Sequence, residues 1–270
     1  MERKLFFHNN YHYGDCLFSL HILNKISEFN NIACEFYCNS DYHFQLKEFT
    51  HKNLRVVLSN KKNENSFDLW GGTFSERANK KFHQNFSSHF KCDANCNYED
   101  VYKKMLAIAQ LFCEDLNLKC PFKIREDLIF DEEILTLTPF DQKFHYLLIN
   151  SYCLSGQVKY SPYQQDLVFL DIINKIKSKN KTFITTKKLL DYPCTSDYNF
   201  TLVQIGQLSK NCKILLGVPT APFLVCLNKY SLLNYEKIIN ITHDICTFHF
   251  DERFFTISSP CIPLSLEIEA

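Results

Sequence analysis

The chain has 270 residues, of which 46% are hydrophobic and 22% are charged, and its 30 basic and 30 acidic residues cancel. This composition excludes an intrinsically disordered chain, and the length suffices for two ordinary domains or one large one. Because there is no basic surplus, and Lys187-Lys188 is only an isolated pair, we expect no nucleic-acid partner.

Strands and helices alternate through the first half of the chain. The predicted strands cover residues 5–7, 32–38, 54–58 and 66–70, and the predicted helices cover residues 16–29, 42–49 and 98–116. One face of the first helix gathers apolar residues at helical spacing, namely Phe18, Ile22, Ile26 and Phe29. The stretch 120–143 carries two prolines and loses this periodicity, which is typical of a linker. We therefore predict an N-terminal Rossmann-like domain over residues 1–135.

The second half alternates more regularly. Its predicted strands cover residues 146–149, 182–185, 213–218 and 237–241, and the helices between them include 200–208 and 221–227. Another helix opens at Ser161-Pro162, where Ser161 and Gln164 have the spacing of a capping box. We expect this helix to bury Leu167, Leu170, Ile173 and Ile176. The pattern predicts a C-terminal Rossmann-like domain over 136–250, with the tail 251–270 packing back on the first domain.

The fold class predicted from this alternation is α/β, with two Rossmann-like domains whose parallel sheets face a central cleft. Each half opens in the same way, with a buried strand, a polar loop that contains glycine, and a helix. The two loops are residues 8–15 and 150–157. Open α/β domains bind ligands at the carboxyl ends of their strands, so both loops are candidate binding sites.

Three motifs that mark common classes of enzyme are absent from the sequence. No G-x-G-x-x-G follows a strand, no P-loop motif occurs, and no G-x-S-x-G elbow is present. These absences argue against a dinucleotide enzyme, a P-loop phosphotransferase and a serine hydrolase. Twin α/β domains without either phosphate fingerprint fit a transferase that uses a nucleotide sugar.

The sequence also supports expectations about the cellular compartment and about metal binding by cysteines. No apolar run approaches the roughly 20 residues of a membrane span, and residues 1–4 lead directly into a strand without a signal-peptide apolar region. We therefore expect a cytoplasmic protein with no transmembrane segment. The 13 cysteines are scattered and odd in number, so we expect reduced thiols. The nearest approach to a zinc spacing lacks a paired C-x-x-C motif and comprises Cys92, Cys96, Cys113 and Cys120.

Two blocks of the sequence resemble GT-B-type glycosyltransferases, most nearly the lipopolysaccharide heptosyltransferase-like group. The first is the Gly-Asp loop at residues 13–17, and the second runs over 197–209 into 214–223. In that family the second block ends in a turn that opens a helix near the donor diphosphate. The turn there usually has an acidic residue, a small hydroxyl residue, glycine and a later histidine. This chain departs from that pattern, with Pro219, Thr220 and Ala221 and no histidine nearby.

The resemblance implies a metal-independent, inverting transfer of a sugar from a nucleotide-activated donor to a glycan or other hydroxyl acceptor. It also implies that Asp15 is the catalytic base, and His12 is a second candidate because its ordinary pKa lies near neutrality. The candidate acceptor-binding residues are those of the first loop, Asn9, Asn10, Tyr13 and Gly14. The candidate donor-binding residues offer hydroxyl, amide or free backbone groups near strand ends, and are Ser155, Gly156, Gln157, Thr185, Thr220 and Ala221.

Purely structural roles also remain open for these residues. Asp15 precedes a predicted helix and has the position of an ordinary N-cap, and Thr220 can likewise be a cap with no ligand. A helix end can neutralise a diphosphate, and no D-x-D pair is present, so we expect neither a metal nor a cofactor beyond the donor substrate. The alternative function is a non-catalytic GT-B-like protein that binds a glycan or nucleotide, or serves in assembly.

Overall fold

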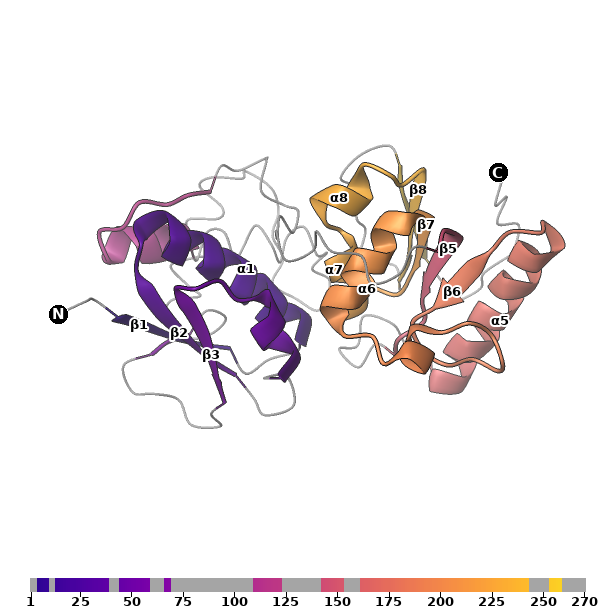
Figure 1. The fold of residues 1–270 in the computed structure, drawn as a ribbon, viewed down its shortest axis with the longest axis horizontal. Coiled ribbons are helices and arrows are strands. Elements are labelled where there is room, and N and C mark those ends of the chain that lie inside the picture. Colours follow the sequence, from indigo (N-terminus) through magenta and orange to yellow (C-terminus); the bar gives the residue numbers. More distant parts are fainter. Residues whose placement is uncertain are drawn as a thin grey trace. The chain divides into compact units, whose positions relative to one another are not determined.

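The computed structural model describes residues 4–9, 13–38, 44–58, 66–68, 109–122, 142–152, 161–242 and 253–258. The chain divides into two compact units, Met1–Ile134 and Leu135–Ala270, and each contains its own parallel sheet (Figure 1). This division lies one residue from the boundary predicted at 135. The central cleft between two facing domains stays a prediction.

The first unit is built on a four-stranded sheet in the order β3-β2-β1-β4, in which every pair is parallel. Its strands are β1 (Lys4–His8), β2 (Ala33–Cys38), β3 (Leu54–Leu58) and β4 (Phe67–Asp68). Helix α1 (Tyr13–Asn30) connects β1 to β2, and the 3₁₀ helix η1 (Lys47–Phe49) precedes β3. A further helical segment, 109–115, packs Phe112 against Phe7 of β1, with ring centroids 4.7 Å apart.

Helix α1 begins earlier than predicted and is buried more completely. It starts at Tyr13 instead of Cys16, so Asp15 lies within its first turn and not in front of it. Of the four apolar residues predicted to share one face, Phe18, Ile22 and Ile26 are buried. Phe29 is 59% exposed, because burial ends before the last turn, where Glu28 is also exposed.

The second unit is built on a five-stranded parallel sheet in the order β6-β5-β7-β8-β9. Its strands are β5 (Phe144–Ile149), β6 (Phe183–Thr185), β7 (Cys212–Gly217), β8 (Lys237–Thr242) and β9 (Phe254–Ser258). Its α-helices are α5 (Pro162–Ser178), α6 (Leu202–Leu208), α7 (Ala221–Cys226) and α8 (Lys229–Leu232). Two 3₁₀ helices, η3 (Thr195–Tyr198) and η4 (Ser209–Asn211), flank α6.

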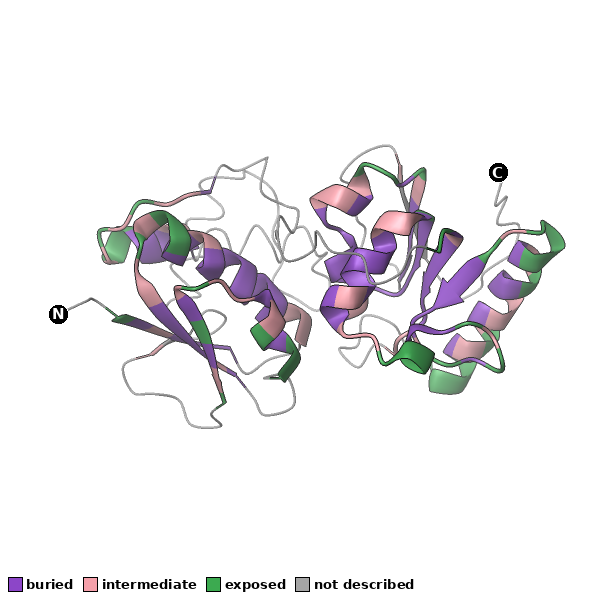
Figure 2. Cartoon of the chain, viewed as in Figure 1, coloured by how far each residue is buried: buried purple, intermediate pink, exposed green. Residues whose placement is uncertain are grey.

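Helix α5 has the start that its sequence predicts. The Gln164 backbone N–H donates to Ser161 Oγ at 3.3 Å, and Gln164 Oε1 accepts from the Ser161 N–H at 3.0 Å. Figure 2 shows β5, β6 and β7 as largely buried and the two ends of α5 as exposed. Leu167 is 47% exposed, so its predicted burial is wrong: it lies two residues, about 200° of helix rotation, from the core residue Phe169.

Part of the predicted tail forms a strand of the second sheet. Residues Phe254–Ser258 pair with β8 as strand β9, while the packing of the tail on the first domain stays a prediction. The sequence did not show this strand because residues 251–258 follow no regular alternation with a helix. No helix among the described residues is long and apolar enough to cross a membrane.

Candidate functional site

Each sheet has one point at which its strand order reverses. In the first sheet β1 has β2 on one side and the later strand β4 on the other, so the reversal lies between β1 and β4. In the second sheet the reversal lies between β5 and β7. Ligands of open α/β sheets bind outside the carboxyl ends of the strands at such points, because the connections there leave the sheet in opposite directions. The two loops singled out from the sequence follow β1 and β5, and therefore both lie at a reversal.

The loop after β1 holds Asp15 by a chain of hydrogen bonds. Asn9 is fully buried, and its Nδ2 donates to Ser19 Oγ at 2.8 Å. Ser19 Oγ in turn donates to the Asp15 carbonyl at 2.9 Å, and Cys16 Sγ donates to the Asn9 carbonyl at 3.4 Å. These bonds fix the first turn of α1, and with it the partly exposed Gly14 and Asp15. The acceptor contact predicted for Asn9 stays a prediction, while its visible role is to hold this loop.

The start of α1 is also tied to neighbouring segments. Tyr13 OH donates to Gln45 Oε1 at 3.1 Å. Burial, together with the nearby Glu48 carboxylate, raises the pKa of Tyr13 well above its ordinary range, so the phenol remains a neutral donor. Across the reversal, His8 Nδ1 and Ser66 Oγ share a hydrogen bond of 2.8 Å. Asn10 and His12 lie outside the described residues. The first unit thus places the Asp15 carboxylate in the first turn of α1, at the positive end of the helix.

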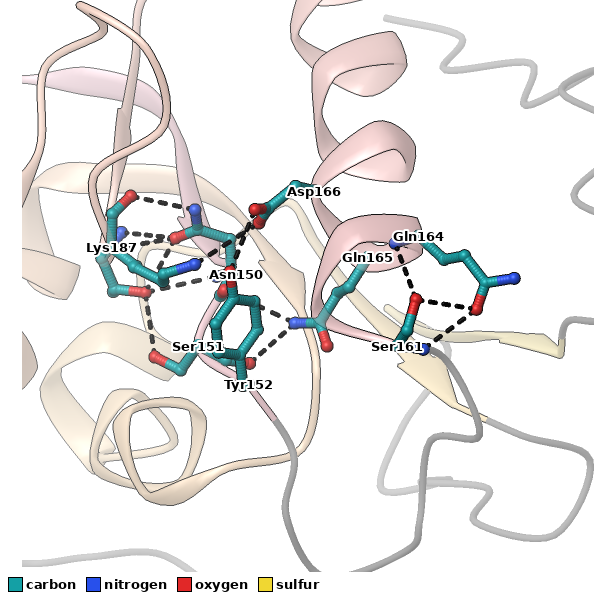
Figure 3. A network of polar contacts seen from close by, with 9 residues as sticks. Asn150, Ser151, Tyr152, Ser161, Gln164, Gln165, Asp166 and Lys187 are labelled. Carbon is teal, nitrogen blue, oxygen red and sulfur yellow. Dashed lines mark hydrogen bonds and ion pairs between the residues drawn. The ribbon is translucent and has the colours of Figure 1, made fainter.

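The second unit has a polar network where β5 and β6 end, with Asn150 at its centre (Figure 3). Asn150 is fully buried. Its Oδ1 accepts from the backbone N–H groups of Thr186 at 3.1 Å and Lys187 at 2.8 Å, and from Thr186 Oγ1 at 3.2 Å. Its Nδ2 donates to the Lys187 carbonyl at 2.9 Å. One amide therefore fixes the backbone that follows β6 to the end of β5.

Lys187 is the cation of this network. Its Nζ lies 3.5 Å from Asp166 Oδ1 and 3.3 Å from the centre of the Tyr152 ring. Tyr152 OH donates to Asp166 Oδ2 at 3.0 Å, so the ring and the carboxylate are themselves connected. Gln165 Nε2 donates to the Ser151 carbonyl at 2.8 Å and joins α5 to the same loop. Figure 3 shows these side chains converging from β5, α5 and the segment after β6.

Two of the donor-binding residues predicted from the sequence, Thr220 and Ala221, lie beside the second reversal. Ser155, Gly156 and Gln157 follow β5 but lie outside the described residues. Thr220 and Ala221 follow β7, where the Thr220 Oγ1 donates to the Val218 carbonyl at 3.3 Å and Ala221 is 8% exposed. Thr220 is the N-cap of α7 by backbone conformation, without a side-chain cap bond.

Thr185 and Gly217 have structural roles beside this reversal. Thr185 is fully buried, and both its N–H and its Oγ1 donate to the Pro193 carbonyl at 3.0 Å, so its predicted donor contact stays a prediction. Gly217 lies beside Ile149 of β5. A Cβ on Gly217 would come within 2.6 Å of the Ile149 carbonyl oxygen and 2.8 Å of its Cα, and would overlap its Cβ. Glycine at this position therefore permits the close contact of β5 and β7.

Sequence reasoning placed Asn150 and Tyr152 in a candidate loop without singling them out, and it missed Asp166 and Lys187. A signal was present, because Asn150 and the Thr186-Lys187 pair directly follow apolar strands. Among the described residues no group of three or more His, Cys, Asp or Glu side chains is placed to hold a metal ion. Cys92 and Cys96 lie outside that part of the chain. The expected absence of a metal stays a prediction.

No protein-family model matches the chain, and no curated protein matches its sequence. Solved structures do match its fold. Escherichia coli heptosyltransferase WaaC with ADP-2-deoxy-2-fluoro heptose is 11% identical, with a TM-score of 0.58 over 96% of this chain and 94% of that one. The glycosyl transferase family 9 protein from Veillonella parvula is 10% identical, with a TM-score of 0.53 over 95% and 86%. Escherichia coli ADP-heptose lps heptosyltransferase II is 7% identical, with a TM-score of 0.51 over 94% and 90%.

The chain therefore has the α/β fold of these glycosyltransferases. The resemblance stated from the sequence is confirmed at the level of the fold, which is what identities of 7–11% establish.

Proposed function

We propose that this protein is a glycosyltransferase that moves a sugar from a nucleotide-activated donor to a hydroxyl group of a glycan or similar acceptor. The observation that carries the proposal is the likeness to a heptosyltransferase along 96% of the chain, in a structure that contains a fluorinated ADP-heptose. An ADP-activated sugar, and a heptose in particular, is accordingly the first donor to test.

The second unit supplies the donor side in this proposal. The diphosphate occupies the reversal between β5 and β7, where Thr220 and Ala221 offer a hydroxyl and a backbone N–H, and Ser155–Gln157 follow the neighbouring strand. Lys187 adds the positive charge that the motif-based candidates lack, and its side chain is 35% exposed. Its neighbour Lys188 already pairs with Asp197 at 2.9 Å. In this proposal the Lys187 ammonium and the start of α7 neutralise the diphosphate in place of a metal ion.

The first unit supplies the base. Asp15 takes the proton from the acceptor hydroxyl, and the acceptor oxygen forms a new bond to the anomeric carbon of the sugar. The bond between that carbon and the diphosphate oxygen breaks, and the nucleoside diphosphate leaves with the electron pair. Attack opposite the leaving group inverts the anomeric centre. A positioned base contributes about 10²–10⁴ to the rate, and stabilisation of the leaving anion adds to it.

The test is a transfer assay with ADP-heptose and other nucleotide sugars, in which release of the nucleoside diphosphate is measured with a panel of hydroxyl acceptors. Asp15→Asn should lower kcat by about 10²–10⁴ and leave nucleotide affinity unchanged. Glu28→Gln is the matched control, because Glu28 is an exposed carboxylate at the far end of the same helix. If the wild type binds none of these nucleotides, the proposed function is wrong.

One feature favours a second candidate, a non-catalytic protein that binds a nucleotide or glycan. The turn before α7 reads Pro219, Thr220 and Ala221, in place of the acidic, hydroxyl and glycine pattern of the glycosyltransferases that the chain resembles. Selective nucleotide binding without turnover, unaffected by Asp15→Asn, would establish this alternative.

A further inference from the structure

Lys187 already has internal partners for its charge. The ammonium lies over the Tyr152 ring and beside the Asp166 carboxylate, at 3.3 Å from the ring centre and 3.5 Å from Oδ1. Tyr152 and Asp166 come from the loop after β5 and from α5, and the hydrogen bond between them keeps the ring and the carboxylate together. Cation, ring and carboxylate thus form one arrangement, which we call the Lys187 cradle.

The contact between Lys187 and Asp166 is of a kind that a ligand can replace. At 3.5 Å it is longer than a hydrogen bond, whereas the pairs Lys188–Asp197 and Lys213–Glu236 lie at 2.9 and 2.7 Å. Asp166 Oδ1 is buried and accepts no hydrogen bond. Both side chains remain partly accessible, at 35% for Lys187 and 27% for Asp166. Departure of Lys187 leaves Asp166 Oδ1 without a partner, and this cost opposes anion binding in the wild type but is smaller in Asp166→Asn, whose side chain carries no charge.

The backbone of Lys187 is held separately from its side chain, by hydrogen bonds to Asn150 and not by the cradle. Asn150 binds both the N–H and the carbonyl of Lys187, at 2.8 and 2.9 Å. Asn150 also continues β5, one of the two strands that border the reversal. Rotation of the side chain alone can therefore carry Nζ from the cradle to a phosphate bound beside β5, without rearrangement of the loop.

We propose that Asp166 and Tyr152 form an internal counter-ion site, which holds Lys187 in the unliganded protein and competes for it with the diphosphate of the donor. This inference rests on the proposed function in one respect, namely that the incoming anion is a nucleoside diphosphate group. Asp166 thereby sets the affinity for the anion, and Lys187 binds phosphate only after it leaves the cradle.

The experiment is calorimetric titration with inorganic pyrophosphate and with ADP at about 0.15 M salt, where charges farther apart than about 8 Å are largely screened. The proteins are the wild type, Asp166→Asn, Lys187→Gln and the double variant. Asp166→Asn should bind pyrophosphate about fivefold more tightly, which equals about 1 kcal/mol. Lys187→Gln should bind it at least tenfold more weakly, and the double variant should match Lys187→Gln.

Two controls separate this effect from a change of net charge. Asp171→Asn removes a carboxylate from the same helix, one that pairs with Lys175 at 3.4 Å, and should leave the affinity unchanged. Lys188→Gln removes the neighbouring cation and should weaken binding far less than Lys187→Gln. Unchanged or weaker binding by Asp166→Asn would overturn the proposal. The proposal would also be overturned if Asp166→Asn raised the pyrophosphate affinity of Lys187→Gln as much as it raises that of the wild type. The coupling between residues 166 and 187 would then be zero.

A measurement on the wild type covers the case in which Asp166→Asn does not fold. In protein with ¹³C-labelled lysine, the Lys187 Cε signal should lie upfield because of the Tyr152 ring, and Lys187→Gln assigns it. Saturating pyrophosphate should move this signal downfield, and a signal that stays in place contradicts the proposal. Pyrophosphate binding without sugar transfer would leave the cradle intact and refute only the proposed function. Sugar transfer by the wild type, together with an Asp166→Asn variant that binds pyrophosphate no more tightly than the wild type, would refute the cradle and leave the proposed function intact.

Discussion

Replacing Asn150 with alanine should both destabilise the second unit and weaken the anion binding proposed for it. The substitution deprives two backbone groups of their partner, the N–H and the carbonyl of Lys187, whereas the Thr186 N–H keeps a second acceptor, the Leu148 carbonyl at 3.0 Å. It also removes the acceptor for Thr186 Oγ1. No other residue in the network of Figure 3 connects the segment after β6 to the end of β5 through its backbone in this way.

The cost follows from the burial of these groups. A buried backbone group that loses its partner costs about 1–3 kcal/mol. Lys187 is half-buried, so water can reach its two groups and place them at the lower end of that range. We therefore expect a loss of about 2 kcal/mol in the free energy of unfolding. For a unit of this size the midpoint of thermal unfolding should fall by roughly 7 °C.

Asn228→Ala is the matched control for this prediction. Asn228 is also fully buried, and its Nδ2 donates to the carbonyls of Gly206 and Val225, at 3.2 and 2.9 Å. Its Oδ1 accepts from the Ser231 N–H at 3.0 Å. Asn228→Ala should lower the free energy of unfolding by a similar amount. It should leave pyrophosphate binding unchanged well below the unfolding temperature, since Asn228 lies away from the carboxyl ends of β5 and β6. Denaturant unfolding and calorimetry measure the two effects separately.

Two results would refute this reasoning. A cost below about 1 kcal/mol for Asn150→Ala would mean that the two backbone groups of Lys187 find other partners. Equal losses of pyrophosphate affinity in Asn150→Ala and Asn228→Ala would mean that binding follows stability alone, and that Asn150 does not place Lys187.

Three further predictions concern the strand contact, the first sheet and the loop of Asp15. Gly217→Ala should cost about 1–3 kcal/mol by denaturant unfolding, because its Cβ would overlap Ile149, and an unchanged midpoint would contradict the contact. Burial acts to raise the pKa of Glu35, but hydrogen bonds from Lys4 and Tyr37 outweigh it and lower that pKa. The resulting stability is present at neutral pH and is lost as pH falls through the lowered pKa, so Glu35→Gln should cost more at about pH 7 than at about pH 3. Ser19→Ala should lower kcat with little change in donor affinity, because Ser19 holds the Asp15 carbonyl; a parallel loss of both would indicate general destabilisation.

Local sequence patterns predicted much of the fold. The strand predicted at 54–58 has the observed bounds, and the capping box at Ser161 forms as its spacing indicates. Such features depend on residues a few positions apart, which a sequence displays directly. Helix burial was less predictable, because helical spacing gives a face but not how far the core extends along it. Phe29 shows this difference, since it lies on the apolar face but beyond the buried turns.

The candidate site was harder to predict because its members meet only through strand order. Asn150 and Lys187 are 37 positions apart, and Lys187 is one of 30 basic residues in the chain. Nothing near Lys187 in the sequence distinguishes it from Lys188, which the structure pairs with Asp197 instead. The pairing of β6 with β5 is what brings the end of one strand against the other. A prediction of that pairing would have pointed to both residues.

Strand order also explains how the fold can persist while the sequence patterns around it change. The position of each loop depends on where its sheet reverses, and that depends on connections and not on a particular motif. Identities of 7–11% with the solved glycosyltransferases are compatible with this, because burial of apolar strands constrains residue class more than residue identity. Asp15 follows β1, which borders the first reversal, and Lys187 follows β6, the strand beside β5 in the second sheet. The proposed function needs a base for the acceptor hydroxyl and a cation for the leaving diphosphate. Under that proposal, the departure at Pro219, Thr220 and Ala221 weighs less against catalysis than loss of Asp15 or Lys187 would.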